Sequence, residues 1–443
     1  MGAAEVRTST GAHEDTGPHH RFGNTAGPDV LRLRLAVLHP QFHPLAAFGG
    51  TLGAGLTARG HRNMQAPAQQ SEPIEALRAL LGSAAVLPGD SAGDGYLVDE
   101  RRLYRGHPLA VVLPGATAEV AAVVRWCHER RVGVVPQGGN TGYCGGATPD
   151  GSGTQLVLSL RRMNRIRRVD ARDYSLIAEA GCVLADVQRA AADAGRLFPL
   201  SLGSEGSCQI GGNLATNAGG VNVLRYGSAR AQVLGIEAVL PDGRVWHGLN
   251  TLCKDNTGYD LAALLVGAEG TLGVITAAAL RLQPRPQATA TALLALPAVE
   301  HAMPLYESLR AATSDTLSSL EYMPHAVVAL AAAELPALRP PLGLDCAALL
   351  LVELEGGATV AATLAQALAR AHSAGLISDA VVASNDAQRA AFWRLRESIP
   401  EAQRRLGASI KHDVSLPLTA LPEFIRRVSA WVDAHVPDGV LVC

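Results

Sequence analysis

Two glycine-rich segments decide how this chain is interpreted. Residues 136–142 read PQGGNTG, and residues 203–220 read GSEGSCQIGGNLATNAGG. Adjacent glycines let main-chain N–H groups approach an anion closely, because no Cβ intervenes and positive φ costs little. Neither segment contains Lys or Arg, so amide dipoles and helix N-termini would have to balance a phosphate charge. The pattern predicts a pyrophosphate cradle and argues against a nucleotide triphosphatase, whose P-loop needs Gly-Lys-Ser/Thr.

The sequence around these segments indicates how they are held. Residues 133–136 are expected to form a strand that leads into the first segment, but no G-x-G-x-x-G opening a long helix follows, which disfavours a Rossmann fold. Residues 210–217 of the second segment can form a short helix whose N-terminus points at the ligand.

Short, interleaved helices and strands are expected over the first two thirds of the chain. They are a helix capped by Ser71 (71–81), a strand (110–113), a helix from Thr117, strands at 155–160 and 175–180 around a basic turn (161–168), a helix (183–194), a hairpin (233–240 with 244–247) and a closing strand (272–282). The basic turn is predicted to be a solvated loop. Pro284 and Pro286 end the last strand and mark a domain boundary.

A β-α-β-β-α-β order follows the boundary and predicts a ferredoxin-like sheet. Its elements are a strand (289–296), a helix (298–312), strands at 317–322 and 347–354, a helix (359–374) and a strand (377–383). A helix over 387–406, a strand over 408–414 and a helix from Thr419 to His435 are expected next. Residues 1–70 lack periodicity and are expected to be a disordered extension, with Met64 as a candidate translation start. The predicted domains are 71–285, with a core at about 106–285, and 286–443.

Composition excludes several classes of function. The net charge is −2, which gives no attraction to nucleic acid, and no apolar run has the length of a membrane span. The seven cysteines are scattered, without C-x-x-C or metal spacing, so buried free thiols in a reducing compartment are expected. These features predict a cytoplasmic protein and leave peripheral membrane association open.

Two further segments extend the glycine pattern into a recognisable set. Residues 254–261 read KDNTGYDL, and residues 267–276 read GAEGTLGVIT. With the first two segments, they closely resemble the FAD-linked oxidoreductases of the vanillyl-alcohol oxidase and para-cresol methylhydroxylase (PCMH) type. The nearest groups are the D-2-hydroxyglutarate dehydrogenases, followed by the D-lactate dehydrogenases and glycolate oxidase subunits. The resemblance implies an α+β fold: a two-lobed PCMH-type FAD-binding domain and a ferredoxin-like cap domain.

The resemblance also implies which residues bind FAD. They are Gly138, Gly139, Asn140, Thr141 and Gly142 in the first segment, Gly206, Ser207, Gly211, Gly212, Thr216, Asn217 and Gly219 in the second, and Ile275 at the adenosine end. Some relatives tether the flavin through a His in the first loop. Neither segment here contains His, so FAD is expected to be noncovalent.

Segments WRLRESIP (393–400) and KHDVSLP (411–417) resemble the substrate-binding motifs of the cap. Arg396 would grip a carboxylate with its planar fork, and Lys411 would add a second positive charge. The alternative is that Arg396 pairs with a nearby acid. Relatives that bind a dicarboxylate often have Thr where Pro400 stands, and proline offers no side-chain hydrogen bond. No catalytic residue is assigned, since His412 and Asp413 point to opposite faces if they lie in a strand.

The resemblance predicts oxidation of a D-2-hydroxy acid to the 2-oxo acid, with electrons passing to a separate acceptor. A homodimer is compatible with this. Relatives carry a G-H-x-G-D-G-N motif with a downstream His and Glu, where a divalent metal acts as a Lewis acid. The sequence stops before that motif, which predicts a chain incomplete at its C-terminus and a metal only in a full-length form. The alternatives are a FAD-binding but inactive fragment or subunit, and an NADPH-driven UDP-sugar reductase, whose catalytic Ser and Glu are not found.

Overall fold

The structure is a computed structural model that describes residues 67–407, 409–436 and 439. The expected extension over residues 1–70 and the candidate start at Met64 lie outside these ranges, apart from residues 67–70. These four residues belong to helix α2 (Pro67–Leu81). Ser71 therefore lies inside the helix, and the prediction that it is the N-cap is wrong.

The first lobe is built on a four-stranded sheet in the order β1-β2-β4-β3. Its strands are β1 (Val86–Pro88), β2 (Ala110–Val112), β4 (Leu156–Ser159) and β3 (Val134–Gln137). Strands β2, β4 and β3 are parallel, and apolar β2 and β4 are buried on both faces. Helix α4 (Thr117–Arg130) packs on the sheet through Val120, Val123, Val124 and Cys127, at the predicted helical spacing.

The second lobe contains an antiparallel five-stranded sheet in the order β5-β6-β10-β8-β9. Its strands are β5 (Ile166–Asp170), β6 (Ser175–Glu179), β10 (Val274–Arg281), β8 (Val233–Val239) and β9 (Val245–Gly248). The predicted hairpin is confirmed, because β8 pairs with β9. The predicted closing strand, β10, lies at the centre of the sheet.

The basic turn predicted over residues 161–168 is only half correct, because strand β5 begins at Ile166. The guanidinium of Arg167 lies 3.3 Å from a carboxylate oxygen of Glu179 and 3.2 Å from one of Glu237. Arg165 also pairs with Glu179, at 2.9 Å. These acids are buried in β6 and β8, so the arginines hold an edge strand to the sheet and do not form a solvated loop.

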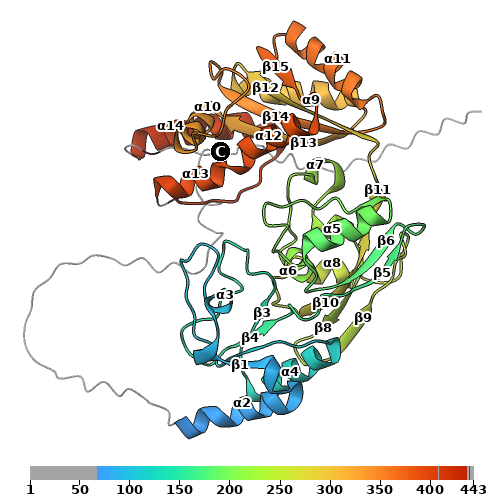
Figure 1. The fold of residues 1–443 in the computed structure, drawn as a ribbon, viewed down its shortest axis with the longest axis vertical. Coiled ribbons are helices and arrows are strands. Elements are labelled where there is room, and N and C mark those ends of the chain that lie inside the picture. The colour runs from blue at the N-terminus through green and yellow to red at the C-terminus, as the bar shows by residue number, and fades with distance from the viewer. Residues whose placement is uncertain (1–66, 408, 437–438, 440–443) are drawn as a thin grey trace, which may run out of the picture. The chain divides into compact units, whose positions relative to one another are not determined.

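Short elements complete the two lobes. They are α3 (Asp94–Leu97), α5 (Leu184–Asp193), α6 (Ile210–Ala215), α7 (Val223–Tyr226) and α8 (Leu261–Leu265), three 3₁₀ turns (Ser83–Ala85, Gly89–Ser91, Ala229–Gln232), and the two-residue strands β7 (Arg196–Leu197) and β11 (Gln283–Pro284), which pair. Figure 1 shows α5 and α6 beside the strands of the second lobe.

The cap is an antiparallel sheet in the order β13-β14-β12-β15. Its strands are β12 (Ala288–Leu296), β13 (Leu317–Pro324), β14 (Ala348–Gly356) and β15 (Asp379–Val382). Helices α9 (Ala302–Thr313), preceded by a 3₁₀ turn (Val299–His301), and α11 (Val360–Ser373) follow β12 and β14. A further helix, α10 (His325–Glu334), is inserted between β13 and β14. Apart from this insertion, the element order is β-α-β-β-α-β, and with the strand arrangement it confirms the ferredoxin-like prediction.

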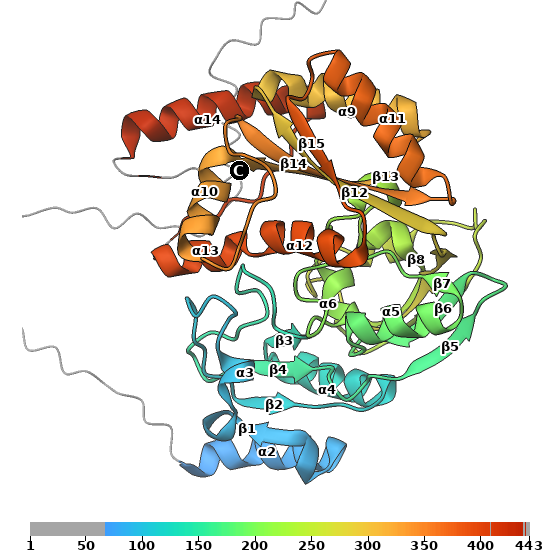
Figure 2. The same cartoon turned by 45° about the horizontal axis from the view of Figure 1, so that its top comes forward.

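Both faces of the cap sheet are covered, and each has its own core cluster. One cluster contains Leu305 of α9 and Leu364 of α11. The other contains Val328 of α10 (His325–Glu334), Phe392 of α12 (Asp386–Glu397) and Ala402 of α13 (Ile399–Leu406). Figure 2 shows these two groups of helices on opposite sides of the strands.

The C-terminal part of the cap departs from the predictions. The helix expected over 387–406 is two helices, which meet at Ser398. Pro400 lies in the first turn of α13, where its missing N–H is tolerated. Described residues 409–417 form no strand, contrary to prediction, and residue 408 is not described. A 3₁₀ turn (Leu418–Ala420) then leads into helix α14 (Leu421–His435).

Helix α7 joins the second lobe to the cap. The Tyr226 hydroxyl donates a 2.6 Å hydrogen bond to the Glu355 carboxylate, and Ser319 Oγ donates a 2.8 Å bond to the carbonyl of Val221. Arg225 Nη1 donates to the carbonyls of Thr316 and Glu355. The strands of the two lobes end at Pro284 and those of the cap begin at Ala288. The domain limits of 71–285 and 286–443 stay a prediction.

Candidate cofactor and substrate site

The first glycine loop presents bare main chain. Strand β3 leads into residues 138–142, whose N–H groups donate to no other residue that the structure describes. The Asn140 side chain is directed to the chain around α3, where Nδ2 donates to the carbonyls of Val98 (2.7 Å) and Gly95 (3.2 Å). Asn140 has φ of 54°, a conformation that asparagine tolerates. Its side chain anchors the loop while five consecutive amides stay available to an anion.

The second glycine segment packs directly against this loop. A Cβ added at Gly139 would lie 2.2 Å from the carbonyl oxygen of Ser207, and one at Gly138 would lie 3.5 Å from Cα of Gly212. Only glycine allows this approach. A Cβ at Gly142, Gly206 or Gly212 would meet no described atom within 4 Å, so these glycines face open space.

Polar groups at the second segment fit an anionic ligand. The N–H of Gly211 is used inside the lobe, where it donates 2.7 Å to the carbonyl of Ala180. The N–H of Gly212 donates to no described residue. Gln209 Oε1 is also buried and accepts no hydrogen bond from the described residues, but as an acceptor it could bind only a donor group of a ligand and not its phosphates. The two segments therefore offer free amide donors around one space, as the pyrophosphate of FAD requires.

The fourth motif closes the other side of this space. The N–H of Gly267 donates to the carbonyl of Leu214 (2.9 Å), and that of Glu269 donates to the carbonyl of Ala215 (2.8 Å), which ties the turn to α6. A Cβ at Gly270 would lie 2.9 Å from Cγ of Pro136, which stands two positions before Gly138, the first residue of the loop. Three of the four motifs thus meet at the end of β3.

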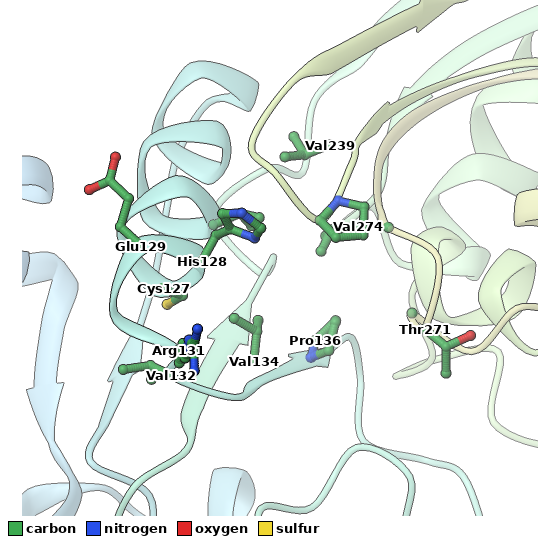
Figure 3. Close-up of a pocket in the computed structure, with 14 residues that line it drawn as sticks. Cys127, His128, Glu129, Arg131, Val132, Val134, Pro136, Val239, Thr271 and Val274 are labelled. Carbon is green, nitrogen blue, oxygen red and sulfur yellow. The ribbon is translucent and has the colours of Figure 1, made fainter.

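A pocket of about 700 Å³ begins at this meeting point. It runs between β3 and β10, and Figure 3 shows Val134 and Pro136 facing Val274 and Thr271, with the end of α4 at one side. Burial raises the pKa of Cys127, which lines the pocket, to about 12, although Arg130 opposes the shift. The thiol is therefore neutral. The lining combines apolar side chains such as Val134 and Val274 with polar ones such as His128 and Arg131, a mixture that could accommodate an adenosine.

The predicted residues of the second segment are placed unevenly. Thr216 is exposed, and its hydroxyl donates to the carbonyl of Gly212 (3.0 Å). Asn217 Oδ1 accepts from Ser228 Oγ and the N–H of Arg230, both at 2.9 Å, so this side chain is turned into the second lobe. Gly206, Ser207 and Gly219 are exposed, as is Gly142 of the first loop, while Thr141 is half-buried.

Ile275 is buried in the core of the second lobe, whereas its neighbour Val274 lines the pocket. Successive residues of a strand face opposite sides, so Ile275 could contact a ligand only through its main chain. The sequence prediction missed three residues that line the pocket: Cys127 and His128 of α4, and Arg131 directly after it. No motif connects them to the glycine segments. Pro136 and Gly270 lie inside the quoted motifs and could have been included.

The cap places Arg396 on α12, facing strand β13. Arg396 Nε donates a 2.6 Å hydrogen bond to Glu321, so the alternative pairing with an acid does occur. Its two terminal nitrogens donate to no described residue and the side chain is 35% exposed, which leaves the fork available. The helix is fixed by residues nearer its start, because Trp393, one turn before Arg396, and Arg389, two turns before it, donate to the buried Glu353.

Lys411 lies in the coil after α13. Its ammonium donates to Gln403 at 2.9 Å, and no contact joins Lys411 to Arg396. Burial and, after it, the positive charges of Arg101 and Arg404 lower the pKa of Lys411. In the described part of the chain, no group of three or more His, Cys, Asp and Glu side chains is arranged to hold a metal ion.

Comparisons with known proteins agree with this geometry. Residues 108–248 match the family described as FAD binding domain, and residues 285–443 match the family described as FAD linked oxidases, C-terminal domain. The D-2-hydroxyglutarate dehydrogenase of Bos taurus is 40% identical over 78% of this chain, which spans 64% of that protein. A probable D-2-hydroxyglutarate dehydrogenase of Oryza sativa subsp. indica is 36% identical over 87% of this chain, which spans 70% of it.

Solved structures support the fold. An alkyldihydroxyacetonephosphate synthase superposes with a TM-score of 0.61 at 19% sequence identity. The match covers 76% of this chain and 64% of the synthase chain. A p-cresol methylhydroxylase superposes with a TM-score of 0.56 at 18% sequence identity. The match covers 72% of this chain and 66% of the hydroxylase chain. The predicted PCMH-type α+β fold is confirmed.

The comparisons also correct one prediction. The cytoplasmic location expected from composition is contradicted, because the bovine and rice relatives, and those from Arabidopsis thaliana and Rattus norvegicus, are mitochondrial proteins. Composition averages over the chain and contains no reliable sign of compartment. Among the described residues, no helix is both long and apolar enough to cross a bilayer. By motif, fold and sequence identity, the chain belongs to the FAD-linked oxidoreductases that include the D-2-hydroxyglutarate dehydrogenases.

Proposed function

We propose that this protein binds FAD noncovalently and oxidises a D-2-hydroxy acid, such as D-2-hydroxyglutarate or D-lactate, to the 2-oxo acid. The observation that carries the proposal is the row of five main-chain amides at residues 138–142, which donate to no described residue and pack against the second glycine segment. Names of the relatives support the reaction. We include a separate electron acceptor and a homodimer in the proposal.

The residues act by binding and orientation. Oxidation removes a proton from the substrate hydroxyl and a hydride from C2. FAD, when bound, supplies the acceptor for that hydride. The glycine segments would hold the pyrophosphate through their amides, and the pocket beside β3 would take the adenosine. Arg396 would hold the substrate carboxylate through its two free terminal nitrogens, so that C2 is held in a fixed orientation.

Alanine substitutions at open glycines test the cofactor site. Gly142→Ala and Gly212→Ala add a methyl group where no described atom lies within 4 Å, so the FAD-free protein should fold normally. The methyl would occupy the space assigned to FAD, and we expect the dissociation constant for FAD to rise about tenfold or more. Gly343→Ala, an equally open glycine in the cap, is the matched control. Fluorescence titration with FAD measures the effect, and unchanged affinity in both variants would overturn the site.

Anaerobic reduction tests the reaction. D-2-hydroxyglutarate or D-lactate should bleach the flavin of the FAD-loaded chain, whereas the L enantiomers should not. Protein that takes up no FAD would contradict the whole proposal. Flavin that binds and stays oxidised with every 2-hydroxy acid would favour the alternative role of an inactive FAD-binding subunit. Acid precipitation should release the flavin into solution if it is noncovalent.

A further inference from the structure

A second pocket, the junction pocket, lies where the second lobe meets the cap. Its volume is about 230 Å³, and it is lined by Leu224 and Arg225 of α7, Tyr306 and Arg310 of α9, Asp315 in the turn after α9, and Leu317 of β13. Figure 1 shows α7 beside β13, and these two elements are in contact. The junction pocket shares no lining residue with the pocket beside β3. It is smaller than the roughly 300–1,000 Å³ of a site for a drug-sized molecule, so it suits a small ligand.

Arg225 is fixed on the lobe side of the pocket by contacts that use only one of its nitrogens. Nη1 donates to the carbonyls of Thr316 and Glu355, and the guanidinium carbon lies 5.2 Å from the centre of the Tyr226 ring. Nε and Nη2 donate to no described residue, and no described carboxylate forms an ion pair with Arg225. The Glu355 carboxylate accepts from the Tyr226 hydroxyl instead. Arg225 therefore brings a fixed positive charge with free N–H groups.

Arg310 and Asp315 form the cap side of the pocket. Arg310 Nε donates to Asp315 Oδ1 at 2.5 Å, and Nη1 donates to the Tyr306 hydroxyl at 3.1 Å. Arg310 Nη2 donates to no described residue, and Asp315 Oδ2 accepts from none. The hydrogen bond from Arg310 lowers the pKa of Asp315, so this carboxylate is ionised near neutral pH. The pocket thus combines two cations that have free donors with one anion that has a free acceptor.

The turn that carries Asp315 is closed by main-chain hydrogen bonds. The N–H of Asp315 donates to the carbonyl of Arg310 (3.3 Å), and that of Thr316 donates to the carbonyl of Thr313 (3.2 Å). Ser314 and Asp315 have φ of 51° and 58°, in the left-handed region that aspartate and asparagine adopt more readily than most residues. The free acceptor oxygen therefore stands on a defined turn, which asparagine at position 315 would keep.

We propose that the junction pocket binds a protonated phosphate group, either inorganic phosphate or the phosphate of a small ester. Arg225 and Arg310 donate to its oxygens from opposite sides of the boundary between lobe and cap. The hydroxyl of the phosphate donates to Asp315 Oδ2. Sulfate has the same shape but carries no proton near neutral pH, so Asp315 repels it and the pocket selects phosphate over sulfate. Bound phosphate links α7 to α9 and adds a contact between the second lobe and the cap.

Isothermal titration calorimetry of the full FAD-loaded chain with inorganic phosphate tests this site, because FAD occupies the glycine segments and cannot be displaced unnoticed. We expect Arg225→Met and Arg310→Met each to raise the dissociation constant for phosphate about tenfold, since each removes a charged donor. Arg370→Met removes an exposed charge from the cap helix α11, outside the pocket, and should change it by less than about twofold.

Asp315→Asn tests the choice between phosphate and sulfate. The wild type should bind phosphate at least about tenfold more tightly than sulfate, because the ionised carboxylate accepts from the first and repels the second. Asparagine keeps a side-chain oxygen without the negative charge. In this variant the sulfate affinity should rise to within about threefold of the phosphate affinity, a gain that a purely structural role of Asp315 would not produce.

A comparison with methyl phosphate identifies the source of the phosphate group. The titrations are made at about pH 6, where inorganic phosphate holds a proton and about half of a phosphate ester does, since its second pKa is about 6. Tighter binding of the ester would identify a phosphate ester as the ligand, and tighter binding of inorganic phosphate would identify the free ion. No binding of either, equal affinity of the wild type for sulfate, or unchanged phosphate affinity in Arg310→Met would overturn the proposal. If Arg225→Met fails to fold, Arg310→Met and Asp315→Asn decide, since both side chains are half exposed or more.

Discussion

Glycines three positions apart in one loop have different roles. At Gly139 an added Cβ would collide with the main chain of Ser207, whereas at Gly142 it would meet open space. Both residues have the same chemistry, and the sequence gives no hint of the difference. The first glycine serves the packing of two protein segments, and the second leaves room for the proposed ligand.

Gly139→Ala should therefore destabilise the FAD-free protein. The 2.2 Å approach to the Ser207 oxygen forces the two segments apart, and we expect the free energy of unfolding to fall by about 1–3 kcal/mol. Urea unfolding of the protein without FAD measures this. Gly142→Ala should stay within about 0.5 kcal/mol of the wild type. Equal destabilisation by both substitutions would show that Gly139 and Gly142 do not have separate roles in packing and in ligand binding.

Arg396 is the second residue with a testable role. Its Nε is held by Glu321 and its terminal nitrogens are free, so Arg396→Ala should weaken binding of a substrate carboxylate more than about tenfold and leave FAD binding unchanged. Arg396→Lys keeps the charge without the fork and should recover little affinity. Calorimetry with D-2-hydroxyglutarate and with FAD separates the effects. Loss of FAD with substrate affinity intact would contradict the assignment.

Among the elements, strand β5 is held to its sheet by charge. Burial alone would raise the pKa of Glu179 and Glu237, but hydrogen bonds from Arg165 to Glu179, and from Thr117 and Arg167 to Glu237, outweigh it and lower both pKa values. A carboxylate whose folded pKa is depressed stabilises the fold above its ordinary pKa of 4.5, and this contribution is lost as pH falls through the folded value.

Arg167→Met should therefore raise the pH at which the protein unfolds in acid. Without the guanidinium, the pKa values of both glutamates rise and protonation begins closer to neutrality. Circular dichroism followed from pH 7 downward measures the midpoint. Arg172→Met, in the turn after β5, removes an equal charge from an exposed side chain and should leave the midpoint unchanged. An unshifted midpoint in Arg167→Met would show that the pairs add no acid resistance.

For the whole molecule, helix α7 links the cofactor lobes to the cap. Burial, and then the hydrogen bond to Glu355, raises the pKa of Tyr226, so the phenol remains a donor across the physiological pH range. Tyr226→Phe should remove this link and lower the free energy of unfolding by about 1–3 kcal/mol, because the Glu355 carboxylate loses its partner. Calorimetric unfolding should then separate into two steps. Tyr306→Phe, in the cap, is the control. A single unshifted transition would contradict the prediction.

The sequence predicted the architecture where apolar periodicity was unambiguous. The cap strands and the helix with Val120 and Val123 were found in this way. Helix α10 was missed because its residues are apolar on all sides, which gives no helical period. Pro400 should have ended the long predicted helix, and residues 409–414 have no partner strand in the described structure. Motifs located the glycine segments, but the ion pairs of Arg167 and the pairing of Arg396 with Glu321 depend on residues far apart in the chain.

The cofactor and substrate sites differ in what surrounds the negative charge. At the glycine segments the contacts are fixed main-chain dipoles, with no Lys or Arg in either segment, whereas the proposed substrate contact depends on the guanidinium of Arg396, whose side chain is 35% exposed. Dissolved ions screen exposed charges over a length of about 10 Å at 0.1 M and about 3 Å at 1 M. Concentrated salt should accordingly release bound organic acids from the purified protein at concentrations at which the yellow flavin stays bound.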